Sequence, residues 1–370
     1  MTENPAPSPN PRTRFDRASR ILQEAIDARA FPGCAFGVLA GGEVVLQDAL
    51  GHFTYEPDSP AVTAATIYDV ASITKIAATT ATAMLLHQRG RLDLEMPLGD
   101  LLPGFVVGRA PGERARQVKL RHLLAHNSGL PGYAELFRAA ATPAALLRAC
   151  LELPLDAEPG ARAEYSDPGF ILLGKALEVL TGEGLASWIR REVHQPLGMT
   201  ATGFCPHPSQ KPLIPPSEED TAFRNRVIQG EVQDENASVL NGVAGHAGLF
   251  SSVPDLLRFA GEILAANAKR EARLLDSATV DQFSQRQGPP GSSRALGWDT
   301  PSEDSSAGKH FSPRSIGHLG FSGCSLWIDL DADLAVVLLT NRTWPDRKSQ
   351  LIREVRPAFH NALRETLASC

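Results

Sequence analysis

The sequence predicts a mixed α/β protein of the α+β type, in which strands near both ends of the chain flank a mostly helical middle. A strand–turn–strand pattern covers residues 34–49, close to the N-terminus. Helical patterns dominate over residues 72–240. A second strand–turn–strand pattern covers residues 325–339, and a helical pattern over about 349–367 closes the chain. Because 370 residues exceed a single typical core, we expect two packed units.

The N-terminal elements are predicted from periodicity and turn chemistry. Residues 15–26 place apolar side chains at helical spacing among polar ones, which is typical of an amphipathic helix. Two apolar runs, 34–40 and 43–49, flank Gly41-Gly42, and glycines accept the positive φ angles of a tight hairpin turn. We therefore expect a helix followed by a β-hairpin.

Towards the C-terminus, the segments 325–329 and 334–339 flank the short acidic stretch Asp331-Ala332-Asp333, which indicates strand, tight turn and strand. Between the two halves of the chain, residues 206–220 are rich in Pro, Ser and Glu, and residues 224–237 are also polar. This composition predicts surface loops. A wall or lid over a cleft is the functional alternative for them.

A hydroxyl and an amine stand three residues apart at Ser72 and Lys75, just before the long apolar run 76–86. On a helix, residues i and i+3 share a face, so the amine can lie beside the hydroxyl. A serine hydroxyl becomes a good nucleophile when a neighbouring base takes its proton, and a lysine of lowered pKa can do so. A helix N-terminus would also stabilise negative charge that develops near Ser72.

The spacing alone does not establish this chemistry. Ser306 and Lys309 have the same spacing in a polar segment without apolar periodicity, which predicts a loop. Serine is also a preferred N-cap, so Ser72 as a cap and Lys75 as a first-turn surface residue form the structural alternative.

Two further patterns favour the catalytic interpretation. Tyr165-Ser166-Asp167 precedes a second apolar helical run, 170–180, so a phenol and a carboxylate can face a cleft from a helix start. His318 and Gly320 lie just before the C-terminal strand pair.

These patterns resemble the S-x-x-K, Y-x-N and H-x-G motifs of the serine β-lactamase and penicillin-binding protein superfamily. The similarity covers about residues 14–365 and includes the segments 123–131 and 242–251. It is strongest to the class C-like branch, which includes penicillin-binding-protein-like hydrolases and β-lactamase-fold esterases.

The resemblance implies a β-lactamase/transpeptidase-like fold, with one antiparallel sheet flanked by N- and C-terminal helices and a mostly helical lobe. We expect a disordered Pro-rich leader over 1–13, a sheet-containing α/β lobe over 14–70 plus 241–370, and the helical lobe over 71–240. A site between the lobes would draw on both.

The resemblance also implies roles for particular residues. Ser72 would attack an acyl carbonyl, Lys75 and Tyr165 would share its proton, and the N–H groups of Ser72 and Phe321 would form the oxyanion hole. The sequence leaves open whether Lys75 or Tyr165 is the general base. The residues expected to bind substrate are Asp167, His318, Gly320, Tyr133 and Arg342.

Three departures from the family pattern bear on the substrate. Asp167 stands where relatives have Asn, so an amide donor is missing and protonated Lys75 is favoured. His318 replaces the Lys of the K-T-G version, and an imidazole of ordinary pKa, about 6.5, is largely neutral at neutral pH and charged only in acid. Arg342 could partly offset that loss by receiving a substrate carboxylate. Gln233 stands where relatives often have His, with no effect that the sequence reveals.

These features favour a serine hydrolase that forms an acyl-enzyme, and we expect an esterase on small or medium acyl esters. The alternatives are a β-lactamase or D-amino-acid peptidase, and a penicillin-binding sensor that acylates without turnover. The small-molecule ester or amide substrate would need no metal and no organic cofactor. We expect structural roles for His126, after its helix, and for His246, in a loop that leads into a helix.

Composition excludes several other classes. The net charge is −6 and no basic stripe is present, which argues against nucleic acid as a partner. No run of 18 apolar residues occurs, so we expect no membrane span. The five cysteines lack a C-x-x-C pair and indicate reduced thiols. Without an apolar leader segment the cytoplasm is the expected compartment, with a periplasmic or secreted protein as the alternative; the oligomeric state is not predicted.

Overall fold

The central element of the structure, a computed structural model that describes residues 14–110 and 112–368, is a five-stranded antiparallel sheet. The expected leader over 1–13 lies outside the described residues. The strand order is β2-β1-β10-β9-β8. The strands are β1 (Gly33–Ala40), β2 (Glu43–Gly51), β8 (Ile316–Leu319), β9 (Ser325–Asp329) and β10 (Leu334–Thr340).

The two ends of the chain meet in the middle of this sheet. β1 pairs with β10 in a register that places Cys34 opposite Thr340. The β1–β2 hairpin turns at Gly41 and Gly42, with φ angles of 60° and 84°, and β9 pairs with β10 across the acidic turn. The prediction of one antiparallel sheet from N- and C-terminal segments is therefore confirmed.

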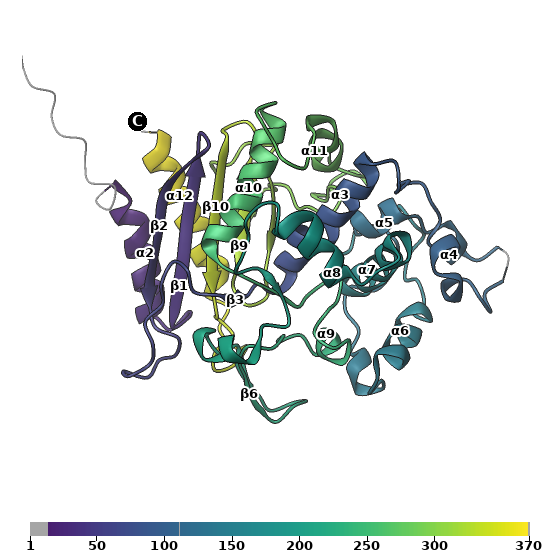
Figure 1. Cartoon of the computed structure of the whole chain (residues 1–370), viewed down its shortest axis with the longest axis horizontal. Coiled ribbons are helices and arrows are strands. Elements are labelled where there is room, and N and C mark those ends of the chain that lie inside the picture. Colours follow the sequence, from purple (N-terminus) through teal and green to yellow (C-terminus); the bar gives the residue numbers. More distant parts are fainter. Residues whose placement is uncertain (1–13, 111, 369–370) are drawn as a thin grey trace, which may run out of the picture.

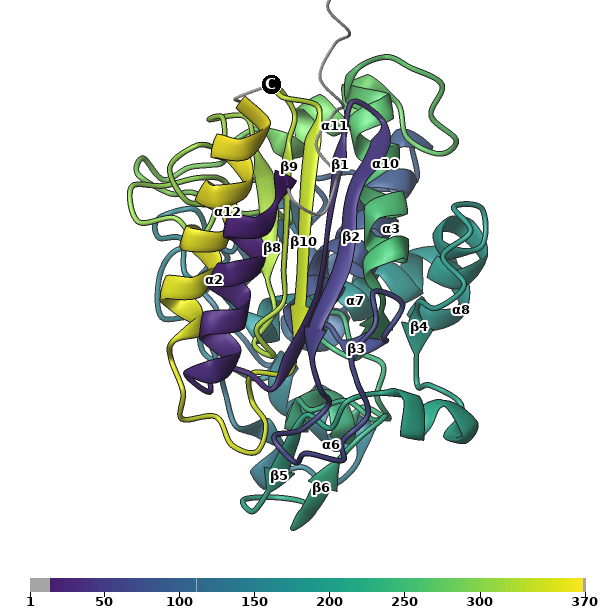
Figure 2. The same ribbon diagram turned by 90° about the vertical axis from the view of Figure 1, so that its left-hand side faces the viewer.

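Helices cover both faces of the sheet, because successive side chains of a strand point to opposite faces and nearly all residues of the central strands β1 and β10 are apolar and buried. α2 (Asp16–Asp27) and α12 (Ile352–Ala368) lie side by side on one face, where Phe36 and Val38 of β1 join their core (Figure 2). α10 (Val253–Asn267) covers the opposite face, where Ala35 joins the larger core. The predicted terminal helices thus match α2 and α12 closely.

The middle of the chain forms a mostly helical region beside the sheet (Figure 1). Its helices are α3 (Ala81–Gln88), α4 (Leu98–Leu101), α5 (Leu120–Leu124), α6 (Pro143–Leu151), α7 (Asp167–Thr181), α8 (Leu185–Ile189) and α9 (Glu235–Val239). Short 3₁₀ turns occupy Ala71–Ile73, Pro103–Phe105, Arg114–Gln117, Leu136–Arg138 and Pro208–Leu213, and π-helical turns occupy Lys75–Thr80 and Arg190–His194. The boundaries 14–70 plus 241–370 and 71–240 stay a prediction.

Between the helical middle and β8, the chain alternates between strand and helix. Two helices, α10 and α11 (Ser277–Ser284), intervene before β8. The segment after His246, expected to lead straight into a helix, first forms strand β7 (Leu249–Ser251). β7 pairs with β3 (Tyr68–Asp69) and with β4 (Gly203–Phe204), so this small sheet fixes the chain just before Ser72.

The polar segments 206–220 and 224–237, predicted as surface loops, also contain regular secondary structure. They contribute the hairpin of β5 (Glu218–Asp220) and β6 (Arg226–Ile228), which ends at a buried cluster around Glu218. Among the described residues, no helix is long and apolar enough to cross a membrane.

Candidate active site

Ser72 lies in a tight turn between β3 and the helical region. Asp69, at the end of β3, accepts a hydrogen bond from the N–H of Ala71 at 2.8 Å, and Ala71 has the unusual φ of 47°. Ser72 follows in a 3₁₀ turn, and Lys75 opens a π-helical segment that continues as α3. The expected helix start at Ser72 is confirmed, but its first turns are not α-helical.

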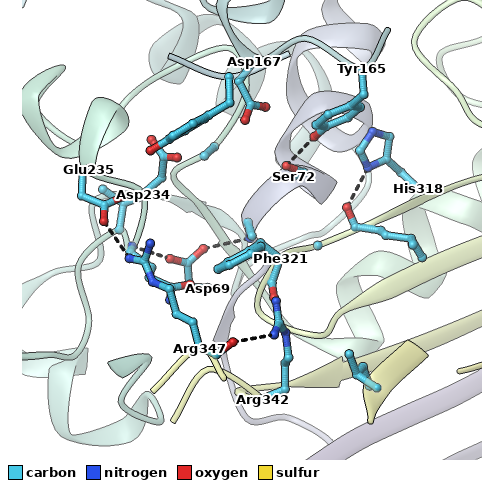
Figure 3. A pocket seen from close by; sticks show the side chains of 18 of the residues that line it. Asp69, Ser72, Tyr165, Asp167, Asp234, Glu235, His318, Phe321, Arg342 and Arg347 are labelled. Carbon is cyan, nitrogen blue, oxygen red and sulfur yellow. Dashed lines mark hydrogen bonds and ion pairs between the residues drawn. The ribbon is translucent and has the colours of Figure 1, made fainter. Parts of the chain in front are cut away.

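Lys75 and Tyr165 converge on the hydroxyl of Ser72. Lys75 Nζ lies 3.0 Å from Ser72 Oγ. Tyr165 Oη donates to the same oxygen at 2.7 Å, as Figure 3 shows. The ammonium also lies 4.7 Å from the centroid of the Tyr165 ring. Residues 90 or more positions apart in sequence are thus brought into one hydrogen-bonded set, whereas Ser306 and Lys309 lie in a loop, as predicted.

Lys75 is fully buried and has an anionic partner. Its Nζ donates to Asp167 Oδ1 at 2.7 Å and to the carbonyl oxygen of His246 at 3.1 Å. Burial alone would lower the pKa of Lys75, but the charge of the Asp167 carboxylate and its hydrogen bond raise that pKa. The expectation that Asp167 favours protonated Lys75 agrees with this geometry.

Tyr165 is a phenol in the same environment. Burial raises its pKa, and the neighbouring Lys75 lowers it only in part. The resting site therefore holds an ammonium and a neutral phenol, each of which donates to Ser72 Oγ.

The Tyr165–Asp167 turn is fixed by its neighbours. Ser166 caps α7 by accepting from the N–H of Gly169 at 3.0 Å. Buried His126 accepts from the N–H of Ser166 at 2.9 Å, and its ring lies 4.7 Å from that of Tyr165. His126 therefore supports the turn, and its structural role includes the positioning of Tyr165 and Asp167.

His318 is buried at the end of β8. Its Nδ1 donates to the carbonyl of Leu319 at 2.8 Å, and its ring lies 5.8 Å from that of Tyr165. Burial, followed by the charges of Lys75 and Arg294, lowers its pKa well below 6.5. The expectation that acid pH near 6.5 would charge His318 is wrong, because the sequence does not reveal this burial.

Gly320 explains the glycine of the H-x-G pattern. A Cβ at this position would lie 2.5 Å from the carbonyl oxygen of Val70. The β8 end therefore approaches the turn before Ser72 more closely than any side chain permits.

Arg342 does not present its guanidinium freely to a substrate. Its Nε donates to the carbonyl of Phe321 at 2.8 Å and its Nη1 to that of Ser349 at 3.0 Å, and the residue is 6% exposed. The guanidinium lies 4.5 Å from the Phe321 ring. The expectation that Arg342 receives a substrate carboxylate stays a prediction: the side chain lines the cavity, but its Nε and Nη1 hold the Phe321 loop.

Ser72 opens into a cavity of about 690 Å³ between the sheet end and the helical region. Tyr133, which is 48% exposed, and Phe321, which is 50% exposed, line it. Asp234 and Glu235 lie on the opposite side from His318 (Figure 3). The segment from Ala222 to Glu235 thus forms a wall of the cavity, as the functional alternative for that loop proposed.

Several residues of this cavity have roles that the sequence did not reveal. Arg294 lines it with 22% of its side chain exposed, 5.4 Å from the Tyr165 ring. Gln233 donates its N–H to Asp69 at 2.8 Å and its side-chain amide to Glu218 at 2.9 Å, so it connects the nucleophile turn to the wall. Asp234 Oδ1 lies within hydrogen-bond distance of His246 Nε2, at 2.9 Å. Only the tertiary fold brings these groups together.

The fold and this arrangement define a β-lactamase/transpeptidase-fold serine hydrolase. The sequence model of the Beta-lactamase family matches residues 18–357, so the chain belongs to that family. It is 30% identical over 367 residues to the N-acetylmuramyl-L-alanine amidase of Bacillus subtilis, covering 89% of this chain and 81% of the relative. A Salmonella typhi protein, provisionally named D-alanyl-D-alanine carboxypeptidase, is 29% identical over 365 residues, covering 89% and 83%.

Solved structures share the fold. EstCE1, described as a hydrolase with promiscuous acyltransferase activity, matches with a TM-score of 0.76 and 24% identity over 95% of this chain and 99% of its own. A β-lactamase from Sulfitobacter sp. EE-36 matches with a TM-score of 0.76 and 20% identity over 98% and 100%. The predicted superfamily and fold class are confirmed.

Proposed function

We propose that this hydrolase cleaves acyl substrates through a covalent acyl-enzyme on Ser72. One observation carries the proposal: the Lys75 amine and the Tyr165 phenol both lie within hydrogen-bond distance of Ser72 Oγ, at 3.0 and 2.7 Å. A nucleophile, its proton partners and a cavity in contact with the same oxygen are what acyl transfer requires.

The reaction begins after the resting Tyr165 phenol has lost its proton to solvent, and the Lys75 ammonium stabilises the phenolate that forms. Ser72 Oγ forms a bond to the carbonyl carbon while its proton passes to the Tyr165 oxygen. The negative charge on the carbonyl oxygen is received by the N–H groups of Ser72 and Phe321. The C–O bond then breaks, the leaving alcohol takes the proton from Tyr165, and water repeats the sequence to release the acid and regenerate Ser72.

Lys75 acts as the cation and Tyr165 as the base in this scheme. Asp167 supports that division, because its carboxylate pairs with Lys75 at 2.7 Å and raises the pKa of the amine. A lysine held charged in this way cannot accept the serine proton.

Small or medium acyl esters are the substrates that we propose first. An ionised Asp167 offers no donor to a substrate amide carbonyl, and the neutral His318 offers no charge to a carboxylate. An uncharged ester needs neither interaction. Its alcohol is also a better leaving group than an amine.

An amidase that acts on carboxylate-bearing acyl amino acids is the second candidate. Arg294 favours it, because its guanidinium is partly exposed in the Ser72 cavity and its ion pair with Asp299 is long, at 3.7 Å, so it can also bind a substrate carboxylate. The names of the B. subtilis and S. typhi relatives point to the same class of bond.

A labelling and turnover experiment tests the proposal. A fluorophosphonate should add covalently to the native enzyme and to Ser306→Ala, but not to Ser72→Ala, as read by intact-mass spectrometry. Turnover of p-nitrophenyl esters, nitrocefin, D-alanyl-D-alanine peptides and acyl amino-acid amides then ranks the substrates. Labelling that persists in Ser72→Ala would contradict the proposed nucleophile.

The same panel separates the two candidates. If amides with a free carboxylate are preferred, Arg294→Ala should lower kcat/KM for them by roughly tenfold or more, with a smaller effect on p-nitrophenyl acetate. If uncharged esters are preferred and Arg294→Ala leaves their kcat/KM unchanged, the esterase is supported.

A further inference from the structure

A buried arginine on the C-terminal helix contacts the loop that carries Phe321. Arg356 of α12 is 6% exposed, and its Nη2 donates to the carbonyl oxygens of Gly320 at 2.8 Å and Cys324 at 2.9 Å. Its Nε donates to the carbonyl of Gly323 at 3.0 Å. One guanidinium therefore holds three carbonyls of a single five-residue turn.

This arrangement is unusual for a buried charge, which normally pairs with an anion. Within residues 14–110 and 112–368, Arg356 forms no ion pair with a carboxylate. Burial lowers its pKa to about 10, which leaves it charged at neutral pH. The cost of burying this charge is offset only by main-chain dipoles of the 320–324 turn, so the arginine contributes to the shape and the potential of that turn.

The bond to Gly320 determines where the next N–H points. In a trans peptide, the C=O of one residue and the N–H of the next point in opposite directions. The Gly320 carbonyl is held by Arg356 and also accepts from the N–H of Gly323 at 3.0 Å. The N–H of Phe321 must therefore point away from α12, on the side where Gly320 and Phe321 line the cavity.

The same turn is tied to the nucleophile. Ser322 Oγ donates to the carbonyl of Asp69 at 2.8 Å, three residues before Ser72. Gly320 lies against the carbonyl of Val70, and Arg356 itself reaches the cavity lining. Contacts with Arg356 of α12 and with the Asp69–Val70 segment together fix the orientation of the Phe321 peptide relative to Ser72.

We propose that Arg356 is a positioning residue of the oxyanion hole, which aims the Phe321 N–H at the developing oxyanion and adds a positive charge behind it. This inference rests on the proposed function, because it takes Ser72 as the nucleophile. Arg356 contacts neither substrate nor reacting atoms. It acts through the 320–321 peptide.

The test compares an oxygen ester with its thiono analogue, p-nitrophenyl acetate and O-p-nitrophenyl thionoacetate. Sulfur is a weaker hydrogen-bond acceptor than oxygen, so an intact oxyanion hole favours the oxygen ester. Arg356→Gln should lower kcat for the oxygen ester by roughly tenfold to a hundredfold, with KM changed little. Its effect on the thionoester should be smaller, so the ratio of the two rates falls. Arg356→Lys keeps a cation and should recover part of that ratio.

Arg364 supplies the matched control. It lies on the same helix, with its Nε on the carbonyl of His310 at 3.0 Å and 19% of its side chain exposed, but outside the cavity. Arg364→Gln should lower Tm while the rate ratio stays at the native value. A ratio that is unchanged in Arg356→Gln would overturn the inference, whether or not kcat falls. Loss of fluorophosphonate labelling in Ser72→Ala establishes the nucleophile separately, so the two proposals can fail independently.

Discussion

Lys75 and Asp167 form an ion pair beside the nucleophile, with 2.7 Å between Nζ and Oδ1 and no exposure of the lysine side chain. Asparagine at position 167 would have left the amine in a buried, uncharged environment. The carboxylate instead raises the pKa of Lys75, against the lowering effect of burial. The residue that departs from the family motif therefore determines the protonation state of the amine at rest.

Asp167→Asn should move the rising limb of the pH–rate profile to lower pH. Without the carboxylate, Tyr165 loses a neighbouring negative charge that raises its pKa, so the phenolate base forms at lower pH. The measurement is kcat/KM for p-nitrophenyl acetate from about pH 6 to about pH 10. Glu135→Gln is the control, since Glu135 is an exposed carboxylate of the cavity lining. A limb that stays in place or moves to higher pH would show that Asp167 does not control the pKa of the base.

Tyr165→Phe and Lys75→Ala should each lower kcat severely, and the double variant should be little worse than either. Both side chains bond the same oxygen of Ser72, and groups that act as a unit give strongly non-additive losses. A double-mutant cycle on kcat, with Tm recorded for each variant, checks this. Losses that multiply would mean that the two groups act in separate steps.

His318 should remain neutral across the working range, so acid pH should not improve the turnover of nitrocefin relative to an uncharged ester. The direction follows from burial, which lowers the pKa of His318 well below 6.5 and leaves the imidazole uncharged at pH values where an exposed one would titrate. His318→Lys introduces an amine at the same place and should raise the ratio of nitrocefin to ester kcat/KM by about tenfold. Native enzyme whose ratio rises steeply as pH falls through about 6.5 would contradict this account.

The residues that the sequence places correctly are those with a local pattern. The i,i+3 spacing, the polar turn before α7 and the glycine at the end of β8 each identify a site residue from a few neighbours in sequence. The hairpin at Gly41-Gly42 and the terminal helices follow from turn chemistry and periodicity in the same way.

What the sequence could not reveal depends on burial and on partners far along the chain. Arg342 is expected to meet a substrate, but it bonds the carbonyl of Phe321. Arg356 looks like any helical arginine until α12 is packed behind the 320–324 turn. The lowering of the His318 pKa likewise depends on the side chains that bury it and on the cation of Lys75. No local pattern encodes these contacts.

Gly320→Ala tests how closely the sheet end must approach the nucleophile turn. Its Cβ would lie 2.5 Å from the Val70 carbonyl oxygen, a main-chain atom in the segment that leads to Ser72, so one of the two turns must move. Because the Phe321 N–H moves with it, we expect kcat to fall by roughly tenfold or more, in proportion to the lost oxyanion stabilisation, and Tm to fall as well.

Gly203→Ala is the matched control for that substitution. Gly203 lies in strand β4, its Cβ would meet nothing within 4 Å, and its φ lies outside the left-handed region. It should leave kcat close to native. If Gly320→Ala lowers Tm but keeps native kcat and the native preference for an oxygen ester over its thiono analogue, then the β8 end and the Ser72 turn need not be in close contact for catalysis. The oxyanion donor would then have to be sought elsewhere than at Phe321.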